Sequence, residues 1–206
     1  MKKIILATGN PGKVKEIQPL VEHLGLQIEA QSAYHVESVE ETGLTFVENA
    51  ILKARHAASK TGLPALADDS GLCVDAINGQ PGIISARYAG GSATDEENNL
   101  KLIHTLAAIK EHSPQIIFHA SFYCALIYLP YADCPSPEIF QGVWHGEIIL
   151  TPRGEEGFGY DPYFYVPKLG KTAAQLTVEE KNRVSHRGIA LQSLKHYFQN
   201  LSPSTI

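Results

Sequence analysis

Cysteine is scarce in this chain: only Cys73, Cys124 and Cys134 occur among 206 residues. Their odd number, wide spacing and lack of a Cys-x-x-Cys pair exclude a disulfide framework and a thiolate metal site. The histidines show no His-Glu-x-x-His or other close ligand spacing, so the sequence does not predict a zinc site either. We expect the three cysteines to be reduced packing residues.

An excess of positive charge is also missing, because 17 Lys and Arg stand against 22 Asp and Glu, for a net charge of -5. No overall basic field would therefore attract nucleic acid or an anionic membrane, and we expect neither as a partner. The apolar runs fall far short of the ~20 residues of a spanning helix. The opening run meets Thr8 too soon for a signal peptide, which predicts a cytoplasmic protein.

The length and the 44% hydrophobic content suit one sizeable core, so we expect residues 1–206 to form a single domain. Linkers, repeats and low-complexity segments are not evident. Apolar periodicity and capping signals predict helices and strands in an order that favours a mixed sheet, of the α/β or α+β class. The predicted strands are 3–7, 64–67, 72–77, 116–129 and 138–150, the last two antiparallel. The first predicted helix follows the loop 8–12, has apolar residues recurring from Ile17 to Leu24 and a kink at Pro19, and the others are 46–61, one capped by Thr94, and 182–201.

Acidic residues follow one of these strands. Asp68 and Asp69 come at the end of the short run 64–67, where adjacent carboxylates repel unless something cationic offsets them. Mg²⁺ would do so, since it commonly takes one or two carboxylates and completes its shell with water and substrate phosphates. Glu40 and Glu41 offer further carboxylates. A simple turn before Gly71, and a solvated face at Glu40-Glu41, are the alternatives.

The loop after the first strand runs Thr8-Gly9-Asn10-Pro11-Gly12-Lys13 and opens a helix. Unpaired N–H groups and the helix dipole favour an anion there, such as phosphate. It is not a Walker A loop, because Ala7 stands where glycine is required and Val14 follows Lys13. An ordinary strand-to-helix turn with a surface lysine would look similar.

Two later segments could recognise a planar base. Gly157-Phe158-Gly159-Tyr160-Asp161-Pro162 combines glycines with two aromatic rings that could stack on a ligand. Lys181 and Ser185-His186-Arg187-Gly188 add cationic and hydrogen-bonding groups near the last helix. A core-lining turn and a charged helix surface are the alternatives, and we expect Tyr123 and Trp144 to be packing residues. Together the clusters supply what a nucleoside triphosphate requires: an anion cradle, carboxylates, an aromatic slot and a basic clamp.

These residues resemble the noncanonical purine NTP pyrophosphatases of the Ham1 or inosine triphosphatase family, nearly end to end. The matching strings, in one order, are Thr8-Gly9-Asn10 with Lys13 and Glu16, Glu40-Glu41-Thr42-Gly43 with Asn49 and Lys53, Ala67 to Leu72, Pro81-Gly82 with Ser85-Ala86-Arg87-Tyr88, Gly157 to Pro162, Glu180-Lys181 and Ser185-His186-Arg187. The chain departs from the pattern at Tyr123, where relatives often have histidine, so local packing or a dimer surface can differ.

The resemblance implies an elongated, two-lobed mixed α/β fold with a cleft between the lobes, and a homodimer. It also implies Mg²⁺-dependent hydrolysis of ITP, dITP and XTP to the monophosphate and pyrophosphate, which cleanses the nucleotide pool. By the resemblance, Glu40 and Asp69 bind the metal and Asp69 is the proton acceptor. The implied substrate contacts are Thr8, Gly9, Asn10, Pro11, Gly12 and Lys13 for the triphosphate, with Ser70, Phe158, Gly159, Tyr160, Asp161, Lys181, His186 and Arg187.

Two other function classes stay open at this stage. A nucleotide-binding sensor without catalysis would use the same loops but would not turn over its ligand. A phosphatase with an aspartyl nucleophile would need Asp-x-Asp directly after the first strand, where this chain has Thr8-Gly9-Asn10. A preference for a 6-oxo purine follows if the His186 ring or backbone N–H groups near Phe158 donate to O6 of the base.

Overall fold

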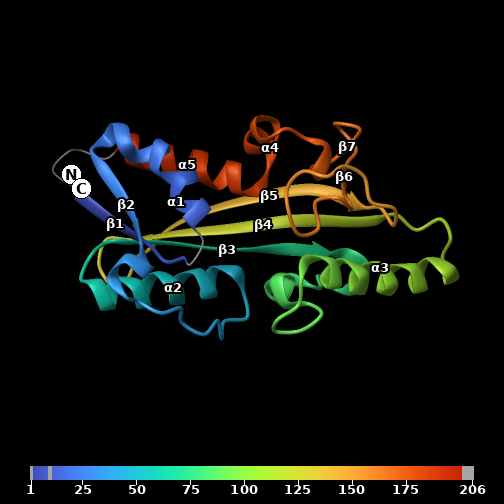
Figure 1. The fold of residues 1–206 in the computed structure, drawn as a ribbon, viewed down its shortest axis with the longest axis horizontal. Coiled ribbons are helices and arrows are strands. Elements are labelled where there is room, and N and C mark those ends of the chain that lie inside the picture. The colour runs from blue at the N-terminus through green and yellow to red at the C-terminus, as the bar shows by residue number, and fades with distance from the viewer. Residues whose placement is uncertain (1, 9–10, 201–206) are drawn as a thin grey trace. The chain divides into compact units, whose positions relative to one another are not determined.

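The computed structural model describes residues 2–8 and 11–200 (Figure 1). Its strands are β1 (Lys2–Leu6), β2 (Leu26–Ala30), β3 (Ala65–Val74), β4 (Phe118–Leu129), β5 (Glu138–Ile148), β6 (Phe164–Val166) and β7 (Lys171–Thr172). Its α-helices are α1 (Pro11–Val21), α2 (Phe46–Thr61), α3 (Asp95–His112), α4 (Val178–Val184) and α5 (His186–Asn200), and short 3₁₀ turns lie between several of these elements. Within the described ranges, no helix is both long and apolar enough to cross a bilayer.

The strands form one mixed sheet in the order β2-β1-β3-β4-β5-β6-β7. β1 pairs in parallel with both β2 and β3, whereas β6 pairs antiparallel with β5 and with β7. β4 and β5 are sheet neighbours joined by a short connection, and a 2.8 Å hydrogen bond between Ser121 Oγ and His145 Nδ1 links their side chains. The predicted mixed α/β class is therefore confirmed.

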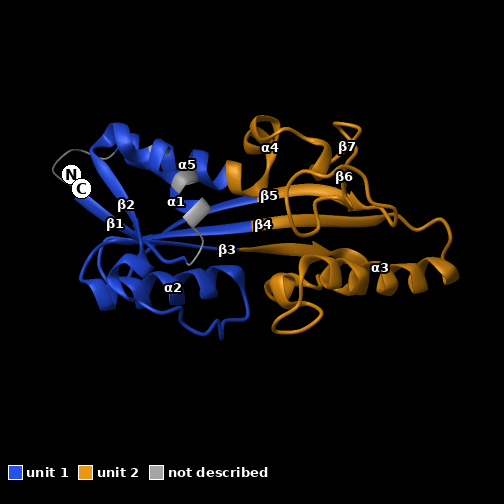
Figure 2. Ribbon diagram, in the orientation of Figure 1, with its two compact units in different colours: residues 1–69, 124–142, 189–206 blue, residues 70–123, 143–188 orange. Residues whose placement is uncertain are grey.

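The chain divides into two compact units, coloured in Figure 2. Unit 1 comprises residues 1–69, 124–142 and 189–206, and unit 2 comprises residues 70–123 and 143–188. The boundary falls inside β3, between Asp69 and Ser70. Unit 1 has two buried clusters of apolar side chains, one on each face of its strands, and unit 2 has one of its own. The elongated shape, the cleft and the single-domain assignment stay predictions.

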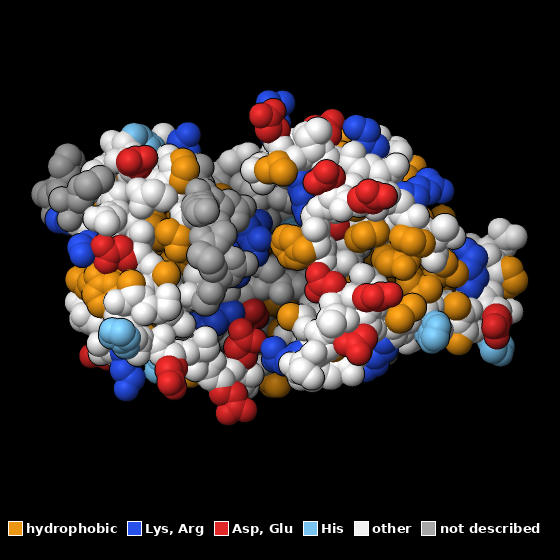
Figure 3. All heavy atoms as spheres, viewed as in Figure 1, with side chains coloured by type: hydrophobic (Ala, Val, Ile, Leu, Met, Phe, Trp, Pro, Cys, Tyr) orange, Lys and Arg blue, Asp and Glu red, His pale blue; other side chains and the backbone are white. Residues whose placement is uncertain are grey.

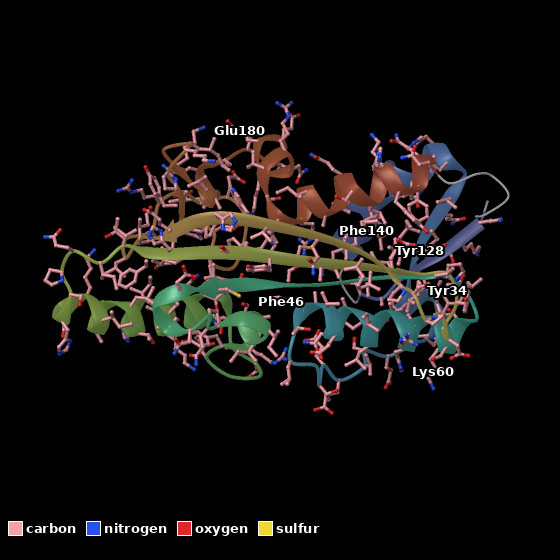
Figure 4. The ribbon with its side chains drawn as sticks, turned by 180° about the vertical axis from the view of Figure 1, so that it is seen from behind. Tyr34, Phe46, Lys60, Tyr128, Phe140 and Glu180 are labelled. Atoms are coloured by element: carbon pink, nitrogen blue, oxygen red, sulfur yellow. The ribbon has the colours of Figure 1, made fainter. Side chains whose placement is uncertain are left out.

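In unit 1, helices cover both faces of the strands (Figure 1). Side chains alternate along a strand, so Ile4 and Leu6 of β1 join the cluster under α1 and α5, whereas Ile5 joins the cluster under α2. Tyr128 and Phe140, labelled in Figure 4, contact the Tyr197 ring of α5 at centroid distances of 6.1 and 5.5 Å. Because both faces are covered, the apolar residues Ile4, Ile5 and Leu6 of β1 are all buried although they alternate between the two faces.

Helix α2 packs through a stripe of four alanines: Ala50, Ala54, Ala57 and Ala58 are all buried. Small side chains let the helix backbone approach the sheet closely. Its predicted boundaries are confirmed, because Thr45 and Glu48 form a capping box and Gly62 adopts a left-handed conformation with φ of 67°. This close and well-capped docking fixes the polar face of α2 relative to β3.

In unit 2, aromatic side chains dominate the core. Phe122 lies 4.6 Å from Phe164 and 6.4 Å from Trp144 between ring centroids, and Trp144 is buried. The prediction that Trp144 is a packing residue is confirmed. The same prediction for Tyr123 was wrong, because the alternation of β4 turns its side chain outward and leaves it 38% exposed.

Several boundaries differ from the predictions. The first helix was predicted to reach Leu24, but α1 ends at Val21 and a 3₁₀ turn follows, and the kink at Pro19 stays a prediction. The predicted strand 72–77 ends at Val74, before a 3₁₀ turn at Asp75–Ile77. The two largest differences lie in β3 and in the last helix. β3 does not end before Asp68 but continues to Val74, since burial and pairing keep this polar stretch extended. The predicted helix 182–201 is two helices, broken at Ser185, whose extended backbone ends α4 and whose Oγ accepts a hydrogen bond from Gly188 N at 3.2 Å. The strands β2, β6 and β7 were not predicted. None of the three cysteines, all of which lie in the described ranges, forms a disulfide, and Cys124 and Cys134 are buried while Cys73 is partly buried.

Candidate active site

The two adjacent aspartates of β3 face different partners, as expected for neighbours in an extended strand. Asp68 receives a bidentate contact from Lys13 of α1, with Nζ at 2.8 and 2.9 Å from the carboxylate oxygens. Asp69 faces α2 instead, where Lys53 Nζ lies 3.0 Å from its Oδ1. Each acid therefore has its own lysine, and the two carboxylates do not converge side by side.

Lys53 is the centre of a partly buried charge cluster in unit 1. Besides Asp69, it contacts Glu41 Oε1 at 2.9 Å, and Asn49 Nδ2 lies 3.4 Å from Asp69 Oδ2. Asn49 and Lys53 lie four residues apart on α2, which places both on the helix face toward β3. Gly43 N donates to Asn49 Oδ1 at 2.8 Å, and a Cβ at Gly43 would come within 2.6 Å of Glu48. The glycine is thus required for this close approach.

The electrostatics of this cluster favour proton transfer at Asp69. Burial raises the pKa of the Asp69 carboxyl above its ordinary value, and the nearby Lys53 ammonium offsets only part of that effect. Burial works against the charged form of Lys53, but Asp69 and Glu41 outweigh it and raise the pKa of Lys53. A carboxylate whose pKa is shifted toward neutrality, in contact with polar neighbours, is typical of catalytic acids and bases.

The predicted anion loop is described only in part. Thr8 follows β1 and is buried, with 9% of its surface exposed, and Lys13 lies in the first turns of α1. Gly9 and Asn10 lie outside the described residues. Pro11 and Gly12 begin α1, as the sequence predicts for a loop that opens a helix. Thr8, Lys13 and Asp68 all belong to unit 1.

In unit 2, the segment 157–161 is a turn built around the Asp161 carboxylate. This carboxylate accepts a 3.0 Å hydrogen bond from Phe158 N and an ion pair from Lys181 Nζ. Asp161 is buried, whereas the Phe158 ring is 66% exposed, with Lys181 Nζ 5.0 Å from its centroid. Gly157 has a φ of +83°, and a Cβ there would collide with Asp161. The turn therefore presents an exposed aromatic face beside a cation.

The start of α5 adds a second aromatic surface. The His186 ring stacks on Phe122 with 4.9 Å between centroids and 12° between planes. Arg187 follows it in the first turn of α5. Tyr160 is buried and donates through its OH to Ser85 O at 2.8 Å, which links the turn to segment 82–87. Tyr160 is thus a structural anchor, and burial raises the pKa of its hydroxyl strongly.

Ser70, the first residue of unit 2, has a buried hydroxyl oxygen with no hydrogen-bond partner among the described residues. Buried hydroxyls usually find a partner, so this oxygen is a candidate for a ligand contact. The predicted substrate contact of Ser70 stays a prediction.

The oxygen donors of unit 1 suit a hard cation. The described part of the chain contains no group of three or more His, Cys, Asp or Glu side chains that could hold a metal ion by themselves. Mg²⁺ does not need one, because it keeps waters and uses substrate phosphates beside one or two carboxylates. Asp69 and Glu41 converge on Lys53, whereas Glu40 is exposed. The predicted ligands Glu40 and Asp69 stay a prediction, with Glu41 as a further candidate.

The predicted site residues thus form two groups, one in each unit. The groups are Thr8, Lys13, Asp68 and Asp69 in unit 1, and Phe158, Asp161, Lys181, His186 and Arg187 in unit 2. Lys53 was absent from the residues to which sequence reasoning gave a role. Its spacing of four from Asn49 on a capped helix was the signal, but that spacing did not reveal which strand the helix faces. A single crevice shared by the two groups stays a prediction.

Comparison with known proteins decides the family. The family model described as "Ham1 family" matches residues 4–197. The chain belongs to the Ham1 family. A dITP/XTP pyrophosphatase of Yersinia pseudotuberculosis is 59% identical over 192 residues, which cover 93% of this chain and 95% of that protein. One from Pectobacterium atrosepticum is 56% identical over 97% of this chain and all of its own length.

Solved structures of the Ham1 family show the same fold. A HAM1 protein from Coxiella burnetii has a TM-score of 0.92 and 48% identity, and the match covers 98% of this chain and 100% of that one. The Staphylococcus aureus Ham1 protein has a TM-score of 0.87 and 41% identity, over 96% and 98% of the two chains. The resemblance seen in the sequence motifs is therefore confirmed.

Proposed function

We propose that this Ham1 family member hydrolyses noncanonical purine nucleoside triphosphates (dITP, ITP and XTP) to the monophosphate and pyrophosphate. The observation that carries the proposal is the near full-length similarity, at 54–59% identity, to proteins named dITP/XTP pyrophosphatase. The lysine–carboxylate cluster of unit 1 and the aromatic, cationic turn of unit 2 support it. They are the chemical groups that a triphosphate and a purine base respectively need.

In this proposal the residues of unit 1 act on the triphosphate. Thr8 to Lys13 bind phosphate oxygens, and the Lys13 and Lys53 ammonium groups neutralise negative charge on the polyphosphate. Glu40 and Asp69, with Glu41 as the further candidate, would hold Mg²⁺, which supplies charge stabilisation at the phosphates. An oxygen of Asp69 accepts the proton of the attacking water as pyrophosphate leaves from the α-phosphorus.

The residues of unit 2 recognise the base. The Phe158 ring offers a face on which the base can stack, and Lys181 and Asp161 offer polar contacts at the edge of the base. Ser70 Oγ also contacts the substrate. His186 and Arg187 complete the base contacts. A donor aimed at O6 of the purine rejects adenine, because an amino group at that position leaves the donor unpaired. Gly159 and Tyr160 contribute to the same pocket through the turn.

The decisive assay measures turnover of ITP, XTP, GTP and ATP at varied Mg²⁺, with products identified. We expect multiple turnover of ITP and XTP with pyrophosphate as the product, and much lower specificity constants for ATP. Release of orthophosphate, or equal specificity constants for ITP and ATP, contradicts the proposal. Binding of ITP without turnover would instead identify a nucleotide sensor, which no observation here favours.

We also propose that the protein acts as a cytoplasmic homodimer, in which the dimer rests on what the resemblance to the Ham1 family implies. The net charge of -5 and the mixed acidic and basic surface seen in Figure 3 support an aqueous compartment over a membrane or nucleic-acid partner. Sedimentation of the purified protein at micromolar concentration tests the dimer, and a mass near 22.5 kDa would contradict it.

A further inference from the structure

Helix α3 makes hydrogen bonds to the turn 157–161, which the proposed function assigns to base recognition. The α3 residues that make these bonds are not among the motifs of the family resemblance. Asp95 Oδ2 accepts a 2.7 Å hydrogen bond from Gly159 N, and Asn99 Nδ2 donates a 2.9 Å hydrogen bond to Gly159 O. The two side chains lie four residues apart and so project from one face of α3. Both polar groups of one residue are therefore fixed from a single rigid helix.

Gly159 is the residue whose conformation sets the geometry of the turn. It lies between Phe158 and Tyr160 with a φ of +59°, a left-handed conformation that glycine adopts without strain but does not enforce. Outside hydrogen bonds must therefore hold it. Rotation of this residue would swing the exposed Phe158 ring relative to the buried Asp161 carboxylate.

Asn99 itself is poorly explained by stability. It is buried, with 8% of its surface exposed, and its Oδ1 has no hydrogen-bond partner within residues 2–8 and 11–200. An unmet buried acceptor is unfavourable, and an apolar side chain would avoid it. Helix α3 needs neither Asp95 nor Asn99 in order to begin, since Thr94 and Glu97 already form its capping box. Local costs of this kind are typical of functional positions.

The hydrogen bonds that Asp95 and Asn99 make with Gly159 also limit which N–H groups of the turn can donate to the base. Phe158 N–H donates to Asp161 and Gly159 N–H donates to Asp95, so both amides already have carboxylate acceptors. Recognition of the purine through this turn then depends on the ring of Phe158 and on side chains whose placement the turn determines. Substitution of Asp95 or Asn99 would therefore alter base recognition without changing any of the proposed phosphate contacts.

We infer that Asp95 and Asn99 are positioning residues for base selectivity, which act by fixing the Gly159 peptide and with it Phe158 and Asp161. This inference rests on the proposed function, because it concerns the base of the same substrate. Neither residue contacts substrate in this scheme. Their effect should fall on KM and on the choice between purines rather than on kcat.

The test compares Asp95→Ala, Asn99→Ala and the double variant with Glu96→Ala as the control. Glu96 shares the exposed, acidic first turn of α3, so its loss matches the change in charge and helix dipole. We expect the single variants to raise KM for ITP about tenfold, to keep kcat within about threefold, and to lower the ITP-to-ATP specificity ratio. Asp95→Asn keeps a hydrogen-bond acceptor, so its KM for ITP should lie much closer to the wild-type value than that of Asp95→Ala.

Amide hydrogen exchange at Gly159 provides a readout independent of catalysis. Asp95→Ala should accelerate this exchange, whereas Glu96→Ala should leave it unchanged. Asp95 is exposed, so its variant should fold even if the buried Asn99→Ala is destabilised. The double variant should be less impaired than the product of the two single effects, because both act on one peptide.

The outcomes separate this inference from the proposed function. If the wild-type protein hydrolyses ITP but the Asp95 and Asn99 variants keep its KM within about twofold and the same ITP-to-ATP ratio, the inference is overturned and the proposed function stands. Variants in which kcat falls while KM for ITP stays unchanged also overturn the inference. If the wild-type protein turns over no ITP at all, the proposed function is rejected and the inference with it.

Discussion

The two groups of candidate site residues are built in different ways. In unit 1, Asp69 and Lys53 project from a central strand and a capped helix, and charge pairs link them. In unit 2, Phe158 and Asp161 belong to an irregular turn, which hydrogen bonds to its backbone hold in place. Rigid elements fix charged groups where proton transfer and phosphate neutralisation need them. A turn can instead be adapted to the shape of a base.

This contrast predicts that changes in unit 1 act mainly on kcat and that changes in unit 2 act mainly on KM and specificity. The strongest test is Asp69→Asn. We expect kcat for ITP to fall about 10³-fold, because the amide cannot accept the proton, while the unfolding temperature falls by only about 2–4 °C, since Lys53 keeps Glu41 as a partner. Measurement of pyrophosphate release checks the rate. Asp75→Asn, an exposed acid just after β3, is the control, and an Asp69→Asn rate within tenfold of wild type would remove Asp69 from the chemistry.

Phe158→Ala should have the next largest effect and should fall on the other parameter. Loss of base stacking, worth about 1–3 kcal/mol, should raise KM for ITP by roughly 5- to 150-fold with kcat nearly unchanged. Steady-state kinetics measure both. Val178→Ala, which truncates a side chain that is 70% exposed, should leave KM unaltered. A fall in kcat alone would break the contrast between the two units.

The pH profile should respond to Lys53. Burial raises the pKa of Asp69 and the Lys53 cation opposes that rise, so Lys53→Met should raise the pKa further. The base must be ionised to act, so the acid limb of kcat/KM should move to higher pH. Lys60→Met, on the same helix and labelled in Figure 4, is an exposed control. An acid limb that stays in place, or moves to lower pH, would mean that another group titrates.

The smallest effects should separate Glu40 from Glu41. Glu41→Gln removes a partner of Lys53 and should lower the unfolding temperature by about 2–4 °C, the equivalent of about 1 kcal/mol. Glu40 is exposed, and Glu40→Gln should leave the unfolding temperature unchanged while raising the Mg²⁺ concentration for half-maximal rate several-fold. Calorimetry and a Mg²⁺ titration measure the two. If only Glu41→Gln changes the Mg²⁺ requirement, Glu41 is the ligand.

Local signals predicted part of this fold well. The capping boxes at Thr45 and Thr94 and the left-handed Gly62 bounded their helices, because these contacts join residues close in sequence. Weak local signals failed elsewhere. The polar run at Asp68 to Gly71 reads as a turn, yet pairing within the sheet keeps it extended. The short strands β6 and β7 depend on each other and on β5, so their own residues carry little periodicity.

By itself, the sequence determined the mixed α/β class, the family and the residue types able to serve a nucleoside triphosphate, since these depend on local patterns and on motif order. Only the tertiary structure decided that Asp68 and Asp69 turn to different lysines, that Glu41 shares Lys53 with Asp69, and that α3 grips Gly159. Such pairings join residues from 12 to 64 positions apart. They follow from which faces of strands and helices pack together, and no spacing within a single element encodes that.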